Sequence, residues 1–390
     1  MAPAKAIVEP IACPLRAGRG YELVAREQLT AAERTALDSA SGDDEPYGIL
    51  RPRRGSRLAP RTVSPDTALL FLTLREPGPL PAYARAALGS DASDTIARLV
   101  LDGVLELKYL GQWYCDGTAA KLLDRGGQAR GCNRVGELSQ AALQYGQELG
   151  DVPEDVLAMR LYGYGRRPIG PELRRQMPDE AAVTTALGLG EDGRARQKLA
   201  TAWSEYRRPE AGTTHWRHWR SRTASGRPRT LRANVKLYLS PTVEALPDAL
   251  QAAADLLAAS PTPTGFKVGV NVGGICRPDK VVMYFDRLDE LHATATDLAC
   301  RLHGVPAHGV PFTAAVTDDG LLSWAADPEV TSWRLWVASR LAEHLGQARR
   351  EAADGLEPWR FALERLRLDG VDPGTWIRAG SSGQRAAADG

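Results

Sequence analysis

The segment 235–239, Val-Lys-Leu-Tyr-Leu, alternates apolar and polar side chains and predicts a β-strand with one buried face. The segments 266–270, Phe-Lys-Val-Gly-Val, and 281–285, Val-Val-Met-Tyr-Phe, predict two more strands. The polar side chains that these strands turn away from the core are Lys236, Tyr238, Lys267 and Tyr284. If the strands are neighbours, these side chains converge on one patch with Arg277, which precedes the third strand.

Two interpretations of this polar patch are open at this point. Half-buried sheets ordinarily turn polar side chains toward solvent, so the patch is a solvated face on the first interpretation. On the second, its lysines, tyrosines and arginine bind a phosphate or another dianion. The glycine-rich segment 271–279 is predicted to be a turn in which glycine supplies positive φ, and its backbone N–H groups can contribute to an anion nest.

Seven short motifs lie in order between residues 135 and 350. They are Leu-Tyr-Gly-Tyr-Gly-Arg at 161–166, Lys-x-Tyr at 236–238, Phe-Lys-Val at 266–268, Arg-Pro-Asp-x-Val-Val-x-Tyr at 277–284, Pro-Phe-Thr at 311–313, Ala-Asp-Pro at 326–328 and Ser-Trp-Arg at 332–334. Together they resemble the HopA-type effector family, whose members act as phosphopeptide lyases in class V lanthipeptide and thioamitide biosynthesis. That family is distantly similar to the phosphothreonine lyase effectors.

The resemblance implies an α+β fold, in which a mixed-sheet lyase domain follows a helical region and a small winged-helix-like module. It implies metal-independent elimination of phosphate from phosphoserine or phosphothreonine in a ribosomally made precursor peptide, which leaves dehydroalanine or dehydrobutyrine. It places Lys267 as the base at the α-carbon, with Tyr238 and Lys236 as further catalytic residues. The phosphate-binding residues that it implies are Arg277, Arg334, Lys236, Tyr284 and Arg340. No cofactor and no metal are expected.

Lys267 must be neutral to accept a proton, whereas a lysine ordinarily titrates near pH 10.4. We expect burial against Phe266 and repulsion from Lys236 and Arg277 to favour the neutral amine. The effector lyases carry a histidine where this chain has Tyr238, and a phenol is a weaker acid than an imidazolium. This difference keeps open a second function, a catalytically degenerate scaffold that presents precursor peptide to a partner kinase or cyclase. A host-directed effector is the third.

Composition and missing motifs restrict the partners. The formal net charge of +1 argues against a general binder of nucleic acid or membrane surfaces. No apolar run approaches the roughly 20 residues that span a bilayer, and no apolar h-region follows the N-terminus, so a cytoplasmic protein is expected. The five cysteines lack Cys-x-x-Cys spacing and are expected to be free thiols. Motifs for phosphoryl transfer from ATP are missing, so a separate Ser/Thr kinase of the same pathway must supply the phosphate.

The chain is expected to have five regions. They are a partly disordered N-terminal extension at 1–63, a winged-helix-like module at 64–120, a helical region at 121–212, a phosphopeptide lyase core at 213–377 and a disordered tail at 378–390. The module is interpreted as structural or as a binder of leader peptide through an exposed edge strand at 105–109. DNA binding is disfavoured because the helix at 94–100 carries one arginine and an aspartate. The Trp- and Arg-rich segment 213–229 is expected to be a loop, either solvated or forming a rim that attracts phosphopeptide.

Overall fold

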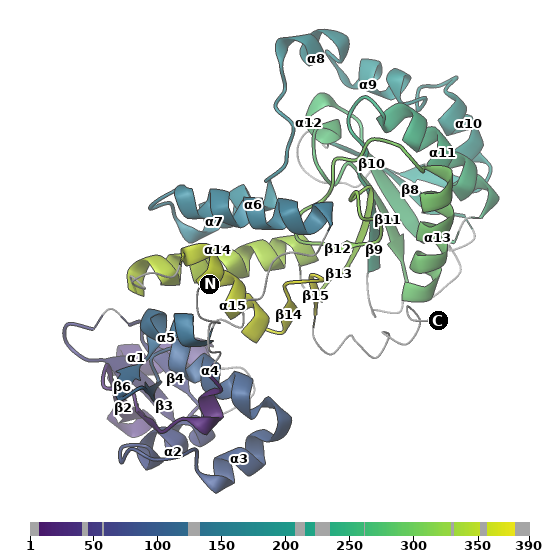
Figure 1. The fold of residues 1–390 in the computed structure, drawn as a ribbon. Helices are drawn as coiled ribbons and strands as arrows, with labels where there is room; N and C mark the ends of the chain where they lie inside the picture. Colours follow the sequence, from purple (N-terminus) through teal and green to yellow (C-terminus); the bar gives the residue numbers. More distant parts are fainter. Residues whose placement is uncertain are drawn as a thin grey trace, which may run out of the picture. The chain divides into compact units, whose positions relative to one another are not determined.

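The chain is an α+β protein, as expected, and it divides into two compact units (Figure 1). The computed structural model describes residues 8–40, 46–56, 58–123, 133–206, 215–222, 235–260, 262–328, 331–351 and 357–378. Unit 1 comprises residues 1–127 and 343–370, and unit 2 comprises residues 128–342 and 371–390. None of the helices in the described ranges combines the length and the apolarity that crossing a membrane requires.

Unit 2 is built on a seven-stranded sheet in the order β12-β13-β9-β11-β10-β8-β7. Its strands are β7 (Trp203–Tyr206), β8 (Trp216–Ser221), β9 (Val235–Leu239), β10 (Gly265–Gly269), β11 (Val281–Phe285), β12 (Ala314–Ala315) and β13 (Leu322–Ala326). The three strands predicted from the alternating segments are β9, β10 and β11. They lie side by side in the middle of the sheet, which confirms that they are neighbours.

Every pair of neighbouring strands in this sheet is antiparallel, whereas a mixed sheet was expected. The helix α11 (Leu246–Ala259) connects β9 to β10, and a crossover of this kind joins parallel strands. Here β11 lies between β9 and β10 and pairs antiparallel with both. The interposed strand therefore prevents the parallel pairing that the crossover alone would produce.

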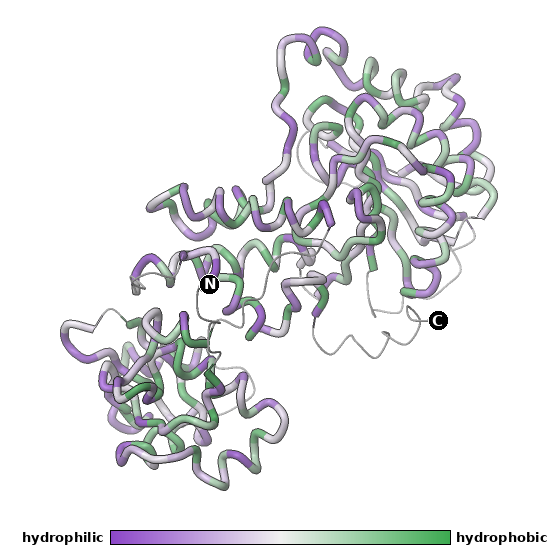
Figure 2. Tube along the Cα trace, viewed as in Figure 1, coloured by the Kyte–Doolittle hydropathy of each residue, from purple (hydrophilic) through white to green (hydrophobic). Residues whose placement is uncertain are grey.

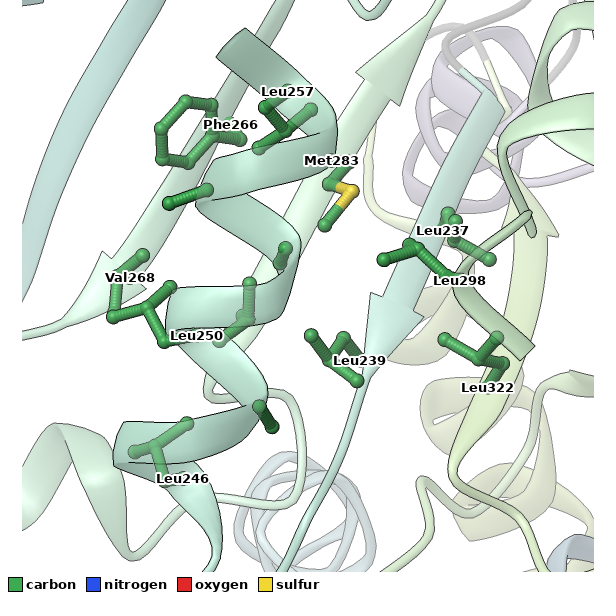
Figure 3. Packing of buried hydrophobic residues seen from close by; sticks show 14 of the residues in the cluster. Leu237, Leu239, Leu246, Leu250, Leu257, Phe266, Val268, Met283, Leu298 and Leu322 are labelled. Carbon is green, nitrogen blue, oxygen red and sulfur yellow. The ribbon is translucent and has the colours of Figure 1, made fainter. Parts of the chain in front are cut away.

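One face of the sheet is covered by α11 and α13 (Leu288–Arg301) and forms the core of unit 2. Apolar residues repeat at helical spacing in both helices, so each turns one apolar stripe toward the sheet. Figure 3 shows strand residues Leu237, Leu239, Phe266, Val268, Met283 and Leu322 packed with helix residues Leu246, Leu250, Leu257 and Leu298. Figure 2 traces the same change between apolar and polar positions along the chain.

The other elements of unit 2 come before, between or after these strands in the sequence. They are α6 (Arg134–Glu148), α7 (Glu154–Tyr162), α8 (Pro171–Gln176), α9 (Glu180–Ala186), α10 (Arg194–Ala200), α12 (Val272–Ile275), α14 (Trp333–Glu351) up to residue 342, β14 (Val371–Asp372) and β15 (Ile377–Arg378). The middle of the Trp- and Arg-rich segment forms β8 and not a loop, while its ends lie outside the described residues. It joins the sheet because Trp219 is buried and stacks on Phe266, with ring centroids 4.8 Å apart.

The glycine-rich segment after β10 is not the turn of positive φ that the sequence predicted. Residues 272–275 form α12, and Asn271 caps it by accepting a hydrogen bond from the Gly274 N–H at 2.8 Å. Neither Gly269 nor Gly274 has positive φ. A Cβ at Gly274 would lie 2.6 Å from the His215 carbonyl oxygen, which is too close. Glycine is required here because two backbone segments approach each other closely, and not because of its φ.

Unit 1 contains two three-stranded sheets, in the orders β1-β5-β6 and β2-β3-β4. Its elements, with η for a 3-10 helix, are η1 (Pro10–Ala12), β1 (Leu15–Ala17), β2 (Tyr21–Ala25), η2 (Arg26–Gln28), α1 (Ala31–Ala40), β3 (Gly48–Pro52), β4 (Arg61–Val63), α2 (Pro65–Thr73), α3 (Ala82–Leu88), η3 (Gly89–Asp91), α4 (Ala92–Leu101), β5 (Leu105–Tyr109), β6 (Gln112–Tyr114), α5 (Asp116–Leu123) and α15 (Pro358–Leu368). The helices α2 to α4 followed by the β5–β6 hairpin are the elements predicted for a winged-helix-like module.

The strand β5 is central in its sheet, so the prediction of an exposed edge is wrong. Leu107 pairs with Leu15 of β1 on one side and with Tyr114 of β6 on the other. Because both hydrogen-bonding sides are occupied, β5 cannot accept a leader peptide as an added strand. The covering strand β1 comes from the expected N-terminal extension, whose described residues also supply the sheet β2-β3-β4.

Residues 343–370 pack with the N-terminal part of the chain, although the sequence placed them in the lyase core. Phe361 of α15 is fully buried in the same apolar cluster as Leu15. Arg365 of α15 pairs with Asp102 at 2.7 Å. The apolar stripe of α15 packs against the other elements of unit 1. No local sequence pattern indicates this packing partner.

We predict that Gly274→Ala lowers the free energy of unfolding by roughly 1–3 kcal/mol, the usual range for an overpacked site. The added methyl group would meet backbone atoms, the His215 oxygen at 2.6 Å and the Gly269 Cα at 2.9 Å. Gly170→Ala is the matched control, because Gly170 has a φ of −75° and no heavy atom lies within 4 Å of an added Cβ. Urea denaturation compares the two variants, and equal stability would contradict the close approach at Gly274.

Candidate functional site

The antiparallel register aligns side chains from five strands on the face opposite the core, because directly paired positions point to the same side. One row consists of Ser323 of β13, Tyr238 of β9, Val282 of β11, Lys267 of β10 and His218 of β8. In the adjacent row, Lys236 lies opposite Tyr284. The structure therefore places Lys236, Tyr238, Lys267 and Tyr284 on one face, as the alternation predicted.

This polar face is largely withdrawn from solvent. Tyr238 is 3% exposed, and the Lys236 side chain is 13% exposed. Lys267 and Tyr284 are half-buried. A solvated face would expose these side chains, so the first interpretation of the patch is wrong. The face is a partly buried polar site.

Lys267 lies against an aromatic ring that the sequence did not assign to the site. Its Nζ is 4.0 Å from the centroid of the Trp216 ring, within cation–π range. Trp216 is on β8, where the register places it opposite Gly269, a position without a side chain. The guanidinium carbon of Arg277 is 5.3 Å from the centroid of the same ring. Trp216 thus positions the candidate base and a candidate phosphate ligand next to each other.

Arg277 is held by a bidentate pair with Asp279. Its Nε donates to Oδ1 at 2.8 Å and its Nη2 to Oδ2 at 2.9 Å. Asp279 is buried, and burial by itself disfavours a charged carboxyl. The positive charges of Arg334 and Arg277 outweigh this effect and hold the pKa of Asp279 well below its ordinary value. Asp279 is therefore an anion that organises the cations around it.

Arg334, in the first turn of α14, reaches the same carboxylate from another part of the chain. Its Nη2 donates to the Tyr162 carbonyl at 2.8 Å and its Nε to the Pro311 carbonyl at 3.2 Å. Its Nη1 lies 3.0 Å from Asp279 Oδ2, but without the angle of a hydrogen bond. Among the described residues, this buried nitrogen has no hydrogen-bond partner. A guanidinium with an unsatisfied N–H group is suited to an anionic ligand.

Tyr162, at the end of α7, connects the two arginines. Its hydroxyl oxygen accepts a hydrogen bond from Arg277 Nη2 at 3.1 Å. Its ring centroid lies 5.5 Å from the guanidinium carbon of Arg277 and 4.8 Å from that of Arg334. The negative face of the ring thus offsets part of the repulsion between two neighbouring cations.

Lys236 is paired with Asp327, which follows β13. Asp327 also accepts a hydrogen bond from the Trp333 N–H at 2.9 Å, so it holds the lysine and the start of α14 together. The Nζ of Lys236 is 5.7 Å from the centroid of the Tyr284 ring. Through Asp327, the position of Lys236 is linked to the helix that carries Arg334.

Tyr238 remains a neutral phenol. Burial, reinforced by the negative charge of Asp327, raises its pKa well above the ordinary value. We find no hydrogen bond from its hydroxyl to another residue in the described part of the chain. Its neighbour across the strands, Ser323, has a buried hydroxyl that is likewise without a partner among these residues. Tyr238 is therefore a hydrogen-bond donor that a ligand on this face can use.

Arg340 is the one predicted phosphate-binding residue that the structure does not bring to this face. It is exposed on α14, with its guanidinium carbon 5.8 Å from the Trp336 ring centroid. Arg340 is six positions after Arg334, so its side chain is turned by about 240° around the helix relative to that of Arg334. Arg340 and Arg334 therefore point in different directions, and only Arg334 reaches Asp279.

The cluster carries an excess of positive charge. Its cations are Lys236, Lys267, Arg277 and Arg334, and its anions are Asp279 and Asp327. With both lysines protonated, two positive charges are not offset by these carboxylates. A phosphate monoester carries about −1.5 to −2 near neutral pH, so its charge matches this excess.

Four residues of the cluster were not predicted as site residues: Trp216, Asp279, Asp327 and Tyr162. The last three lie within the motifs that carry the resemblance. A carboxylate has no obvious role in binding phosphate, and Tyr162 lies outside the three strands that predict the polar face. The sequence signal that could have identified the two acidic residues is the single aspartate in each of the motifs Arg-Pro-Asp and Ala-Asp-Pro. A buried acidic residue needs a cationic partner, and the nearby arginines and lysines are the available ones.

A second buried pair, Lys280 and His308, lies just before the start of β11. Lys280 is fully buried, and its Nζ lies 2.7 Å from the Pro241 carbonyl and 2.9 Å from His308 Nδ1. His308 Nε2 is 2.6 Å from the Gly165 carbonyl, which can only accept, so Nε2 carries the proton and Nδ1 accepts from Lys280. Burial lowers the pKa of Lys280 to about 7 and that of His308 to about 4.

The described residues contain neither a metal-binding cluster nor a disulfide bond. No group of three or more His, Cys, Asp or Glu side chains among them is arranged to hold a metal ion. His215 instead contacts the Asn271 side chain at 2.8–2.9 Å. Cys13, Cys115, Cys276 and Cys300 are free thiols, as predicted, and Cys132 lies outside the described residues.

No family model matches the chain, and no curated protein matches its sequence. Solved structures with a similar arrangement include an effector protein from Pseudomonas syringae pv. tomato strain DC3000, 14% identical with a TM-score of 0.40, where the match covers 65% of this chain and 99% of that one. The phosphothreonine lyase effectors OspF from Shigella flexneri and VirA (SpvC) from Chromobacterium violaceum match at 14% identity, with TM-scores of 0.26 and 0.27. These matches cover 33% and 42% of this chain and 74% and 77% of theirs. Similarity of this degree carries no residue's role to this chain.

We predict that Lys280→Met flattens the dependence of stability on pH. The pKa of Lys280 is about 7 in the folded protein and near 10.5 when unfolded, so between these values the unfolded chain binds more protons and stability rises with pH. Without Lys280, the gain in unfolding free energy between pH 7 and pH 9 should be smaller by roughly 2 kcal/mol. Urea denaturation at both pH values measures it. The control is Lys198→Met, an exposed lysine, and an equal pH dependence in both variants would contradict the burial effect.

Proposed function

We propose that this chain eliminates phosphate from phosphoserine or phosphothreonine in a peptide, leaving dehydroalanine or dehydrobutyrine. The observation that carries the proposal is the position of Lys267, on a partly buried face beside Lys236, Arg277 and Arg334. These three cations outnumber the two carboxylates, so the site keeps a net positive charge even when Lys267 is neutral. A base at the α-carbon and a set of cations around the leaving phosphate are the two things that this reaction needs.

The elimination breaks the Cα–H and Cβ–O bonds and forms the Cα=Cβ double bond. Neutral Lys267 accepts the α-proton at Nζ, and the electron pair of the Cα–H bond becomes the double bond. The Cβ–O electron pair departs with the phosphate. Tyr238 donates a hydrogen bond to the departing oxygen from its neutral hydroxyl, and Lys236, close to it on β9, stabilises the same developing charge.

The phosphate is bound by Arg277 and Arg334 on one side and by Lys236 on the other, with Tyr284 beside Lys236. Both arginines are held in place before the substrate arrives, because Asp279 and Tyr162 already contact them. Preorganised donors of this kind stabilise developing charge without having to reorganise during the reaction.

The substrate in this proposal is a ribosomally made precursor peptide with a leader and a core. A separate Ser/Thr kinase must phosphorylate the core first, because the chain lacks the motifs for phosphoryl transfer. Dehydroamino acids are electrophiles toward thiols, so a cyclase that joins them to cysteine is a natural consumer of the product. Nucleic acid and membrane surfaces have no place in this scheme, in line with the net charge of +1.

A second candidate function is a peptide-binding scaffold, and one observation favours it. Burial and the charge of Asp327 raise the pKa of Tyr238, which makes this phenol an even weaker acid than usual. If the reaction depends on protonating the leaving oxygen, the site would bind phosphopeptide and present it to the kinase or cyclase without turning it over.

One experiment separates these functions. A synthetic phosphothreonine peptide is incubated with the protein alone in EDTA and followed by mass spectrometry. Loss of the elements of phosphoric acid, giving dehydrobutyrine, supports the lyase. Replacement of phosphate by hydroxyl would identify a phosphatase and contradict the proposal. Unchanged peptide that still binds would leave the scaffold as the function.

Lys267→Ala is expected to lower the rate of elimination by roughly 10²–10⁴-fold, the usual effect of removing a general base. Affinity for phosphopeptide should change much less, because a base acts mainly in the transition state. Single-turnover kinetics and fluorescence anisotropy measure the two quantities separately. Lys198→Ala, at a lysine 53% exposed, is the control and should be unaffected. A Lys267→Ala rate above about a tenth of the unaltered protein's would refute the assignment.

Arg277→Ala is expected to weaken binding of phosphorylated peptide by roughly 10–100-fold and to leave unphosphorylated peptide unaffected, since charge-assisted hydrogen bonds contribute about 1.5–3 kcal/mol. Arg340→Ala is the matched control on an exposed arginine and should bind both peptides normally. Equal weakening for both peptides in Arg277→Ala would show that Arg277 supports the fold alone. Arg277→Ala and Arg334→Ala each leave the buried Asp279 without one of its two arginines, so urea denaturation of both variants is measured beside binding.

A further inference from the structure

A groove lined by tryptophans lies at the β12–β13 end of the sheet in unit 2. Four tryptophans from three segments line it, together with Asp327 and Arg378: Trp324 of β13, Trp333 and Trp336 of α14, and Trp376 between β14 and β15. Its cavity volume is about 130 Å³. Such a volume accommodates a large side chain, and flat indole faces suit an apolar or aromatic one.

The walls of this groove are held in place by specific contacts. The rings of Trp333 and Trp336 are stacked with centroids 5.5 Å apart, and Trp333 Nε1 donates to the Phe312 carbonyl at 2.9 Å. Trp376 packs edge-on against Phe312 and has a φ of +58°, a strained conformation for a bulky residue. Strain of this kind persists where the surrounding structure enforces it and is concentrated at binding sites.

Asp327 makes the groove continuous with the candidate site. Its carboxylate belongs to the groove wall, pairs with Lys236 and accepts the Trp333 N–H. A phosphate bound at Lys236 is therefore separated from the groove by this one side chain. Residues two apart in an extended peptide point to the same side and lie roughly 6–7 Å apart. A side chain two positions from the phosphoresidue therefore has the reach to enter the groove.

We propose that this tryptophan groove binds an apolar or aromatic side chain of the phosphopeptide, two residues from the phosphoserine or phosphothreonine. The inference rests on the proposed function and adds a source of selectivity to it. The cationic cluster recognises a charged group but no side chain of the peptide. The groove lets the same site distinguish between phosphoresidues by their neighbours.

The test uses phosphothreonine peptides with Phe or Ala two positions before or after the phosphoresidue. Affinity is measured by fluorescence anisotropy with Lys267→Ala protein, in which the peptide persists, and kcat/KM with unaltered protein. One of the Phe peptides should bind about 10-fold more tightly than its Ala counterpart, the gain expected from burying one aromatic side chain. Trp336→Ala should abolish this preference, and Trp336→Phe, which keeps an aromatic face, should retain most of it. Trp113→Ala, in unit 1, is the control.

Equal affinity for Phe and Ala peptides at both positions would overturn the groove's role, and so would a preference that survives Trp336→Ala. In either case the groove does not recognise a neighbouring side chain of the phosphopeptide. The two proposals fail separately in this design. A Phe preference in binding without any elimination refutes the lyase and keeps the groove, whereas elimination without a preference does the reverse.

Discussion

The carboxylate of Asp279 is the interaction on which the polar face depends. It lies just before β11 and binds Arg277 two residues away and Arg334 from the start of α14. A buried carboxylate without partners would lose several kcal/mol of solvation, and two adjacent arginines without an anion would repel each other. The three charges are stable together and would not be separately. This requirement draws α14 onto the sheet.

Asp327 repeats this arrangement on the other side of the face, where it pairs with Lys236 and binds the first turn of α14. Each carboxylate thus joins a cation of the sheet region to the same helix. The two carboxylates offset part of the positive charge, and the excess that remains favours a phosphate ligand. The site is preorganised and charged before a ligand arrives, which is the arrangement that electrostatic catalysis needs.

Burial decides the chemistry of the individual groups on this face. Tyr238 stays protonated because it is withdrawn from water beside Asp327. Burial lowers the pKa values of Lys280 and His308, which likewise favours their neutral forms, and His308 donates to the Gly165 carbonyl. Gly165 lies three residues after Tyr162, so this buried pair supports the segment that contacts both arginines. A sheet face open to solvent would show none of these shifts.

The sequence by itself determined the three central strands, because the alternation of apolar and polar residues fixes which side chains share a face. It likewise determined the α+β class and the main helices. Only the tertiary structure decided which charged residues meet. Asp279 and Tyr162 are 117 positions apart, and no local pattern indicates that Arg277 joins them. Arg340 has the same chemistry as Arg334 but faces away, because six positions on a helix do not complete whole turns. The sequence also could not show that one edge of β5 pairs with β1, a strand distant in the sequence. Local periodicity follows from backbone geometry, whereas partners distant in sequence are chosen by burial and charge in the folded chain.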